Sequence, residues 1–149
     1  MQPLSPRAAE ATRRAWRDLG FFYVRDDARC EWRLTGSRQG LLAFADIAEA
    51  YSQNSAFGTP SEHKHIGPHG YLELQTSDEP NIGQHAICGT QRDIARLAAL
   101  IRTRLRMSAP GTQVVIREEF APTATYSLAL DVRDDKFDPA SADTQLAIS

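Results

Sequence analysis

The chain has 149 residues, enough for one domain with a core of its own, and 42% of them are hydrophobic. Seventeen basic against nineteen acidic side chains give a formal net charge of −2, which disfavours non-specific nucleic-acid binding by counterion release. The N-terminus lacks the apolar core of a signal peptide, and no stretch is apolar for the roughly 18 residues of a membrane helix. A cytoplasmic protein without a membrane span is therefore expected.

Both cysteines are expected to be buried thiols. Cys30 and Cys88 each lie in a run in which apolar residues alternate with polar ones, which suits a side chain that faces a core. Two cysteines alone do not make the disulfide framework of a small secreted domain, so a reducing compartment is expected.

The first elements in the chain are a helix and a hairpin. A helix is predicted over residues 6–19, because Ser5 can cap its first turn and alanines recur at three- and four-residue steps. Residues 21–24 and 30–34 are rich in aromatic and β-branched side chains, which predicts two antiparallel strands. The residues of the second strand that its alternation directs to the core are Cys30, Trp32 and Leu34.

A second helix and a long irregular segment follow. Ser37 can cap a helix that ends near residue 53, with Leu41, Phe44 and Tyr51 on its apolar stripe. Residues 55–69 then lose all periodicity. An irregular segment of this length in a compact domain is typical of a functional or mobile loop.

The middle of the chain predicts a second hairpin and a third helix. Alternation in residues 70–76 and 85–89 indicates two strands, joined by a long turn rich in Pro, Asn and Gly. Thr90 and Asp93 then form a capping-box pattern, with Asp in place of the usual Glu or Gln. The apolar spacing of the helix that follows is unbroken to residue 105.

The last third of the chain predicts a third hairpin and a tail. Residues 113–120 and 126–132 have the alternation of two further strands. Residues 134–149 are acidic and rich in turn formers, so a poorly ordered tail is expected, with Phe137 as its one anchor. The folded domain would then be residues 1–133.

These elements together predict an α+β fold. Three hairpins imply antiparallel pairing, and three amphipathic helices need a sheet face to cover. The expected architecture is a mainly antiparallel sheet of about six strands, with the three helices packed on one face.

The histidines suggest a metal site as an alternative to a purely structural role. Imidazoles two residues apart in the loop 62–69 can converge on one transition-metal ion, and a ligand from the return strand can complete the site. In this alternative the chain is a small metal-binding protein or a metal-dependent enzyme. The candidate ligands are His63, His65, His69 and His85.

Other catalytic arrangements find little support in the sequence. Cys88 and His85 are three residues apart, so in a strand they point to opposite faces and cannot form a nucleophile and base. No Walker loop, GxGxxG or GxSxG pattern occurs. The neighbouring acids Glu118 and Glu119 have the spacing of a solvated strand face. We therefore expect no catalytic residue and no cofactor.

Charge is unevenly distributed along the chain. Residues 117–143 carry seven acids against three bases, whereas residues 92–106 carry five arginines against one aspartate. Surfaces of opposite sign steer protein partners by electrostatic complementarity, although charged helix and strand surfaces are also common without any partner.

A resemblance to a known family covers about a third of the chain, residues 61–105. The run SEHKHIGPHGYLELQTSDEPNIGQHAICGT, followed by RDIARLAALI, resembles immunity proteins of bacterial polymorphic-toxin systems in its glycines, prolines and apolar positions. The resemblance implies a protein that binds a cognate toxin domain and needs no catalytic residues of its own. It transfers no site residues, because such proteins bind through variable surfaces.

The preferred hypothesis is thus a non-enzymatic binding protein with a toxin domain as its partner. Recognition loops on a rigid scaffold carry adaptable polar and aromatic groups. The contact is expected on the loop 57–69 and on the turn 77–84, with the acidic C-terminal face as an alternative. A homodimeric structural or regulatory protein is a further alternative. The candidate contact residues are Phe57, His63, His65, His69, Tyr71, Asp78 and Glu79.

Overall fold

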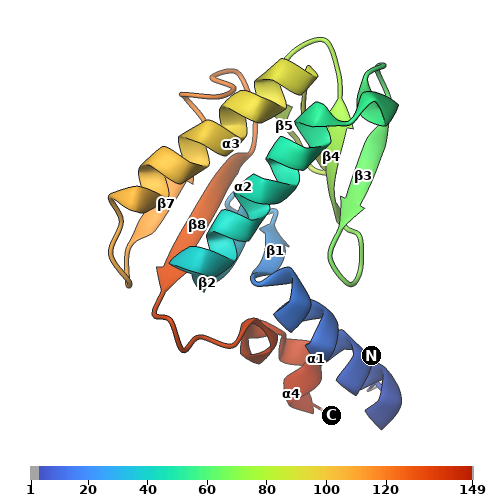
Figure 1. The fold of residues 1–149 in the computed structure, drawn as a ribbon. Coiled ribbons are helices and arrows are strands. Elements are labelled where there is room, and N and C mark those ends of the chain that lie inside the picture. Colours follow the sequence, from blue (N-terminus) through green and yellow to red (C-terminus); the bar gives the residue numbers. More distant parts are fainter. Residues whose placement is uncertain (1–3, 149) are drawn as a thin grey trace.

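The computed structural model describes residues 4–148; the first three residues and the last residue of the expected tail lie outside this range. The predicted α+β class is confirmed (Figure 1). The helices are α1 (Pro6–Leu19), α2 (Arg38–Gln53), α3 (Gln91–Arg106) and α4 (Thr144–Ile148), and the 3-10 helices are η1 (Ser55–Phe57) and η2 (Pro139–Ala142).

The strands form two four-stranded mixed sheets. The first has the order β1 (Phe22–Asp26), β2 (Glu31–Ser37), β8 (Ser127–Arg133), β7 (Gln113–Ile116). The second has the order β3 (His63–Ile66), β4 (Leu72–Thr76), β6 (Ala86–Gly89), β5 (Asn81–Ile82). In each sheet the two central strands are parallel and both outer pairs are antiparallel.

The predicted single antiparallel sheet of six strands, covered by three helices on one face, is wrong. The strands expected to pair as the second hairpin, β4 and β6, run parallel instead. The reason is β5, two residues long, which reverses the chain inside the expected turn. β3 also lies within the segment expected to be irregular, because its sequence HKHI has one apolar residue and does not read as a strand.

Two interlocked ββαββ units explain this architecture. The orders β1-β2-α2-β3-β4 and β5-β6-α3-β7-β8 are the same series of elements. Each sheet combines the first hairpin of one unit with the second hairpin of the other. The two units meet at the parallel pairs β2–β8 and β4–β6. Each four-stranded sheet therefore needs two strands from each unit.

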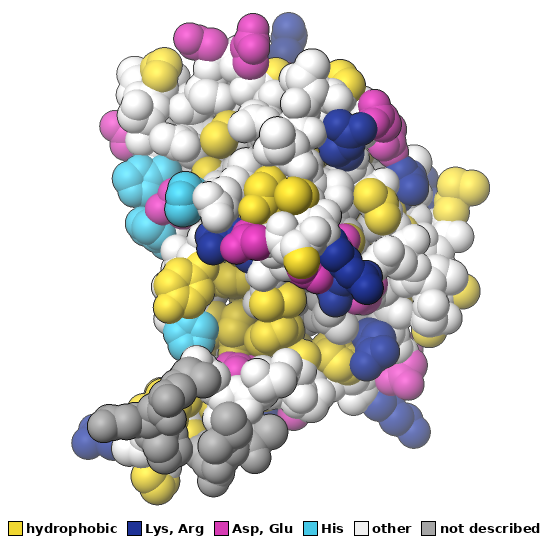
Figure 2. Space-filling view, turned by 180° about the vertical axis from the view of Figure 1, so that it is seen from behind, with side chains coloured by type: hydrophobic (Ala, Val, Ile, Leu, Met, Phe, Trp, Pro, Cys, Tyr) yellow, Lys and Arg dark blue, Asp and Glu magenta, His cyan; other side chains and the backbone are white. Residues whose placement is uncertain are grey.

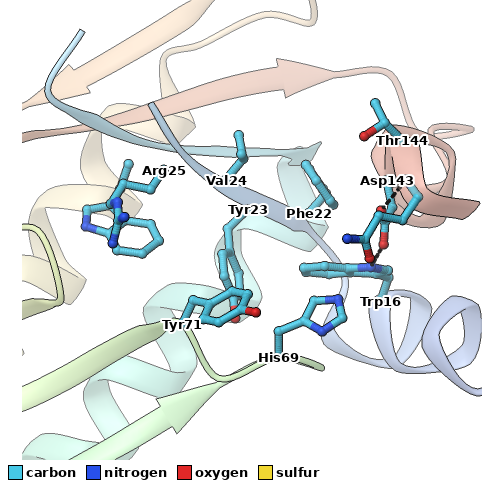
Figure 3. Close-up of a pocket in the computed structure, with 11 residues that line it drawn as sticks. Trp16, Phe22, Tyr23, Val24, Arg25, His69, Tyr71, Asp143 and Thr144 are labelled. Atoms are coloured by element: carbon cyan, nitrogen blue, oxygen red, sulfur yellow. Dashed lines mark hydrogen bonds between the residues drawn. The ribbon is translucent and has the colours of Figure 1, made fainter. Parts of the chain in front are cut away.

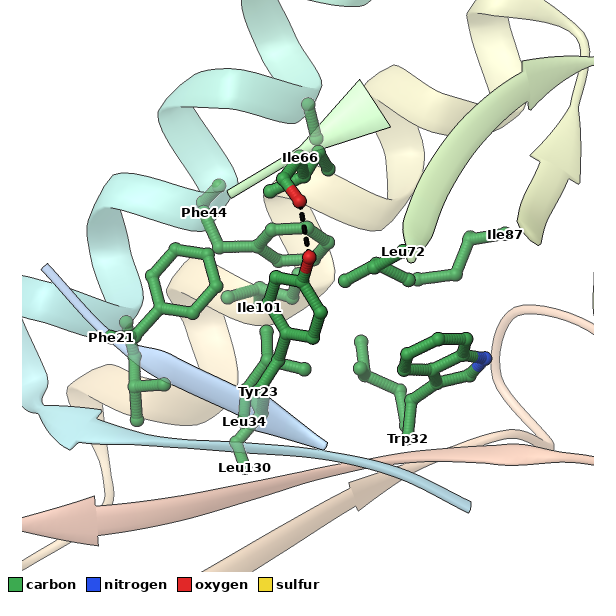
Figure 4. Packing of buried hydrophobic residues seen from close by; sticks show 14 of the residues in the cluster. Phe21, Tyr23, Trp32, Leu34, Phe44, Ile66, Leu72, Ile87, Ile101 and Leu130 are labelled. Atoms are coloured by element: carbon green, nitrogen blue, oxygen red, sulfur yellow. Dashed lines mark hydrogen bonds between the residues drawn. The ribbon is translucent and has the colours of Figure 1, made fainter. Parts of the chain in front are cut away.

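The core lies between the sheets and the pair α2–α3, which pack side by side (Figures 1 and 4). Tyr23 of β1 links the two sheets, because its hydroxyl donates a hydrogen bond to the carbonyl of Ile66 in β3. The large side chains that Figure 4 shows in this layer include Phe21, Trp32, Leu34, Phe44, Leu72, Ile87, Ile101 and Leu130.

The helix starts follow the sequence pattern. The Ser5 hydroxyl accepts a hydrogen bond from the amide of Ala8 at 3.1 Å. At the start of α3 the Thr90 hydroxyl accepts from the amide of Asp93, and the Asp93 carboxylate accepts from the amide of Thr90, both at 3.0 Å. Both bonds of the capping box therefore form with the shorter aspartate in place of Glu or Gln.

The C-terminal segment, for which the sequence predicts a poorly ordered tail, folds back onto α1 in its described part. Arg17 donates two hydrogen bonds to Asp138, at 3.1 and 3.0 Å. The indole of Trp16 donates to Asp143 at 2.8 Å, and both of these side chains are buried. Phe137 packs under the guanidinium of Arg133 rather than against the core.

The expectation of two buried thiols is wrong for Cys30. This residue is exposed and has a φ of +52°, because it closes the turn between β1 and β2 and does not belong to the alternating strand. Cys88 on β6 is half-buried, and burial raises the pKa of its thiol. Both cysteines are free thiols, as expected.

A close approach between α2 and the end of α1 gives a test of the fold. A Cβ on Gly40 would lie 2.0 Å from the carbonyl oxygen of Gly20, which is backbone and cannot move aside cheaply. We expect Gly40→Ala to lower the free energy of unfolding by about 3 kcal/mol, as overpacking does, in urea titrations.

The matched control is Gly111→Ala. Gly111 has a φ of +91°, but an added Cβ would have no neighbour within 4 Å. This change should lower the free energy of unfolding by about 1 kcal/mol, from backbone strain alone. Equal losses for the two variants would contradict the close packing at Gly40.

Candidate functional site

A cavity of about 420 Å³ opens between α1, β1, the loop 67–71 and the segment 143–145 (Figure 3). Aromatic rings make up most of its wall. Figure 2 shows it as a hollow with hydrophobic side chains, next to a group of histidines. We call it the aromatic pocket; its aromatic lining residues are Trp16, Phe22, Tyr23, Trp32, His69 and Tyr71.

The buried wall of the aromatic pocket is held rigidly. Trp16 packs against Phe22 and Tyr23 with ring centroids 4.7 and 5.2 Å apart, and Tyr23 meets Trp32 edge-on at 6.0 Å. Each indole has an acceptor: Trp16 donates to Asp143, and Trp32 donates to the carbonyl of Gly83 at 2.9 Å. The rings therefore cannot turn without breaking hydrogen bonds inside the protein.

The rim of the aromatic pocket is formed by the loop 67–71. Tyr71 is 70% exposed, and its ring stacks on His69 at 5.7 Å. Gly67 and Gly70 have φ angles of +81° and +64°, and a Cβ on Gly67 would lie 2.6 Å from the ring of Tyr23. Only glycine fits there, so the loop rests directly on the buried wall.

Charged groups stand at the two ends of the aromatic pocket, as Figure 3 shows. At one end the guanidinium of Arg25 lies over the ring of Trp32 and 2.7 Å from the carboxylate of Asp27. At the other end Asp143 accepts hydrogen bonds from two neutral donors, the indole of Trp16 and the amide of Gln145.

A second cluster lies on the outer face of β3 and β4. His63, His65 and Glu73 each place one possible ligand atom within 4.8 Å of the others, so together they could hold a metal ion. Both histidines are exposed, with ring centroids 5.1 Å apart. Nδ1 of His65 lies 3.0 Å from Oε1 of Glu73. We call this group the histidine cluster.

The four histidines of the predicted metal site do not come together. The structure joins His63 and His65, but adds Glu73 as the third member. His69 faces the aromatic pocket, where it lies 6.0 Å from Trp16. His85 is exposed in the bend directly before β6, outside this cluster.

The predicted contact residues divide among four places. His69 and Tyr71 line the aromatic pocket, and His63 and His65 belong to the histidine cluster. Phe57 stacks on Tyr51 at 4.3 Å. The carbonyl of Phe57 also accepts from the hydroxyl of Thr76 at 2.6 Å, so this residue has a structural role. The last two residues, Asp78 and Glu79, are exposed in the turn after β4.

Ion pairs neutralise much of the charge on the basic segment 92–106 and on the acidic segment 117–143. On α3, Arg102 contacts both Asp46 and Glu49 of α2, and Arg104 contacts Glu119. These pairs leave less uncompensated charge on the surface than the local sums of the sequence indicate.

Comparisons with protein-family models, curated proteins and solved structures find no match to this chain. Among residues 4–148, no helix has the length and apolar character needed to cross a membrane.

The bond between Trp16 and Asp143 makes a testable contribution to stability. We expect Asp143→Ala to lower the free energy of unfolding by about 2 kcal/mol, because it leaves a buried indole N–H without an acceptor. Glu10→Ala, which removes the exposed partner of Arg13 on α1, is the control and should cost less than about 1 kcal/mol. Urea titrations of both variants would contradict the assignment if the two losses were alike.

Stability should fall at alkaline pH because of three buried phenols. Burial raises the pKa of Tyr23 and of Tyr51, and the hydrogen bond to the Asp27 carboxylate raises the pKa of Tyr126. A phenol with a raised pKa in the folded state stabilises the fold below the ordinary value of about 10. This contribution is lost as the pH rises through the folded-state pKa.

Tyr23→Phe should therefore reduce the slope of unfolding free energy against pH between about pH 10 and 12. Thermal melts along this range give the slope, and an unchanged slope in Tyr23→Phe would contradict the prediction.

Proposed function

We propose that this chain is a cytoplasmic binding protein without catalysis of its own, which neutralises a bacterial toxin domain by binding it at the aromatic pocket. The observation that carries the proposal is Tyr71, 70% exposed at the rim of a cavity whose wall is made of buried aromatic rings. The choice of a toxin domain as partner rests on the resemblance of residues 61–105 to immunity proteins.

An exposed aromatic ring beside a rigid cavity has the character of an interface hot spot. Tyrosine and tryptophan supply large contact areas with few rotatable bonds, and they concentrate at the centre of protein–protein interfaces. Here the stack of Tyr71 on His69 and the contact of Gly67 with Tyr23 fix the loop 67–71 before any partner arrives. Little conformational entropy is then lost on binding.

The wall of the aromatic pocket favours a side chain with an apolar stem and a cationic tip. The ring faces of Trp16, Tyr23 and Tyr71 attract cations through their quadrupoles. The positive charge of Arg25 is offset by Asp27, whereas Asp143 has its hydrogen bonds from neutral groups. We therefore assign an arginine or lysine of the partner to this pocket.

Tyr71 gives the sharpest test of the proposal. The chain is co-expressed with each member of a panel of bacterial toxin domains, survival of the host is scored, and the affinity for a neutralised toxin is measured by calorimetry. Tyr71→Ala should weaken binding by about 30-fold, corresponding to a hot spot of about 2 kcal/mol. Tyr71→Phe, which keeps the ring face, should stay within a few-fold of the parent chain.

A surface far from the aromatic pocket supplies the control. Val115 on β7 is an exposed apolar residue, and Val115→Ala should leave both survival and affinity unchanged. Survival with none of the toxin domains would contradict neutralisation. Neutralisation that persists in Tyr71→Ala with undiminished affinity would contradict the placing of the contact.

Pairing of two copies through the same surface is the competing proposal. Sedimentation of the free chain decides between them, because a dimer that Tyr71→Ala converts to monomer would favour homodimerisation over toxin binding.

A further inference from the structure

We propose that His63, His65 and Glu73 bind a divalent transition-metal ion, with Zn²⁺ as the ion that best matches this set of ligands. This inference is independent of the proposed toxin binding, because none of the three residues lines the aromatic pocket.

The geometry of the two strands brings the three side chains together. His63 and His65 are two residues apart on β3, so their rings project from the same face. Glu73 is the direct cross-strand partner of His65 in the antiparallel pair β3–β4. On β4 the neighbours of Glu73, Leu72 and Leu74, are buried, which places the cluster on the outer face of the sheet.

A backbone carbonyl steadies each imidazole. Nδ1 of His63 lies 3.1 Å from the carbonyl oxygen of Ser61, and Nδ1 of His65 lies 2.9 Å from that of Gly70. An acceptor at Nδ1 fixes the proton there and leaves Nε2 with a lone pair for a metal ion. Because Oε1 of Glu73 lies 3.0 Å from Nδ1 of His65, the carboxylate has to turn toward Nε2 to become a ligand. A hydrogen bond from the second ring nitrogen to a carbonyl or carboxylate is the usual support of a metal-bound histidine.

The ligand atoms need only a modest closure to bind an ion. Bonds of about 2.0–2.1 Å around a tetrahedral ion place its ligand atoms roughly 3.3 Å apart. The three possible ligand atoms lie within 4.8 Å of one another, and the histidines are free to adjust because they are exposed. Rotation of the Glu73 side chain brings a carboxylate oxygen to the third position.

Two imidazoles and one carboxylate leave part of the coordination sphere open. Three protein ligands are typical of zinc sites whose fourth position holds an exchangeable water or substrate. Purely structural zinc sites have four protein ligands. The open side faces solvent, since both histidines are exposed.

Calorimetric titration of the untagged chain with ZnCl₂ tests the site. We expect saturable binding of one ion per chain, and a rise in melting temperature with ZnCl₂ that EDTA reverses. His63→Ala and His65→Ala should each weaken the affinity at least about tenfold, and Glu73→Gln should do the same if the carboxylate is a ligand.

His85 is the matched control. His85→Ala removes an imidazole outside both the cluster and the aromatic pocket, so it should bind Zn²⁺ like the parent chain. Melting temperatures in EDTA show whether each variant is folded. No saturable binding by the parent chain, or equal binding by the folded double variant His63→Ala/His65→Ala, would overturn the metal site.

Binding that survives Glu73→Gln unchanged would overturn the assignment of Glu73. Because Tyr71→Ala leaves all three ligands in place, loss of toxin binding in that variant together with normal Zn²⁺ affinity would separate the two proposals.

Discussion

The hydroxyl of Tyr23 and the carbonyl of Ile66 make the contact on which the candidate functional face of the molecule depends. Tyr23 lies on the outer strand of one sheet, and Ile66 ends the outer strand of the other. Their hydrogen bond holds together two edges that the strand ladders leave unjoined. The loop 67–71 packs directly on the ring of Tyr23 through Gly67.

The interlocked repeat and the elements outside it have different roles. The two ββαββ units supply the core, with α2 and α3 packed together over their sheets (Figure 1). α1, η2 and α4 lie outside the repeat and pack on one another beside β1. The aromatic pocket forms where this addition meets the first sheet and the β3–β4 loop. The function proposed for the chain thus belongs to a surface that neither repeat unit has alone.

The two candidate sites share a short segment of backbone. Gly70 lies between His69 and Tyr71, and its carbonyl oxygen is the acceptor 2.9 Å from the ring of His65. A change at the histidine cluster therefore reaches the rim of the aromatic pocket through one hydrogen bond. The pocket and the cluster nevertheless use different side chains, so their ligands can be studied separately.

Local signals were enough to predict most helices and strands, but not their pairing. Caps such as Ser5 and the pair Thr90–Asp93 act within one helical turn, so the sequence displays them directly. Strand β3 was missed because its outer face carries histidines. The parallel pairs β2–β8 and β4–β6 depend on contacts between distant segments. The spacing of apolar residues within one segment carries no information about such contacts.

The sequence predicted the exposed residues of the candidate sites, but not the residues that tertiary contacts bring to them. Exposed polar loops can be recognised in a sequence, and so His63, His65, His69 and Tyr71 were predicted as functional residues. The buried wall was missed, because Trp16 reads as part of an amphipathic helix and its partner Asp143 lies 127 residues away. Glu73 was missed because it becomes a neighbour of His65 only through the register of β3 and β4.

Fluorine NMR of the chain labelled with 5-fluorotryptophan tests the central claim most directly. The two tryptophans of the chain, Trp16 and Trp32, both line the aromatic pocket, so the spectrum has one resonance for each. If a toxin domain binds at this pocket, both resonances should shift on its addition, and Tyr71→Ala should reduce the shift at equal toxin concentration. A toxin domain that binds the chain while both resonances stay in place would contradict the account.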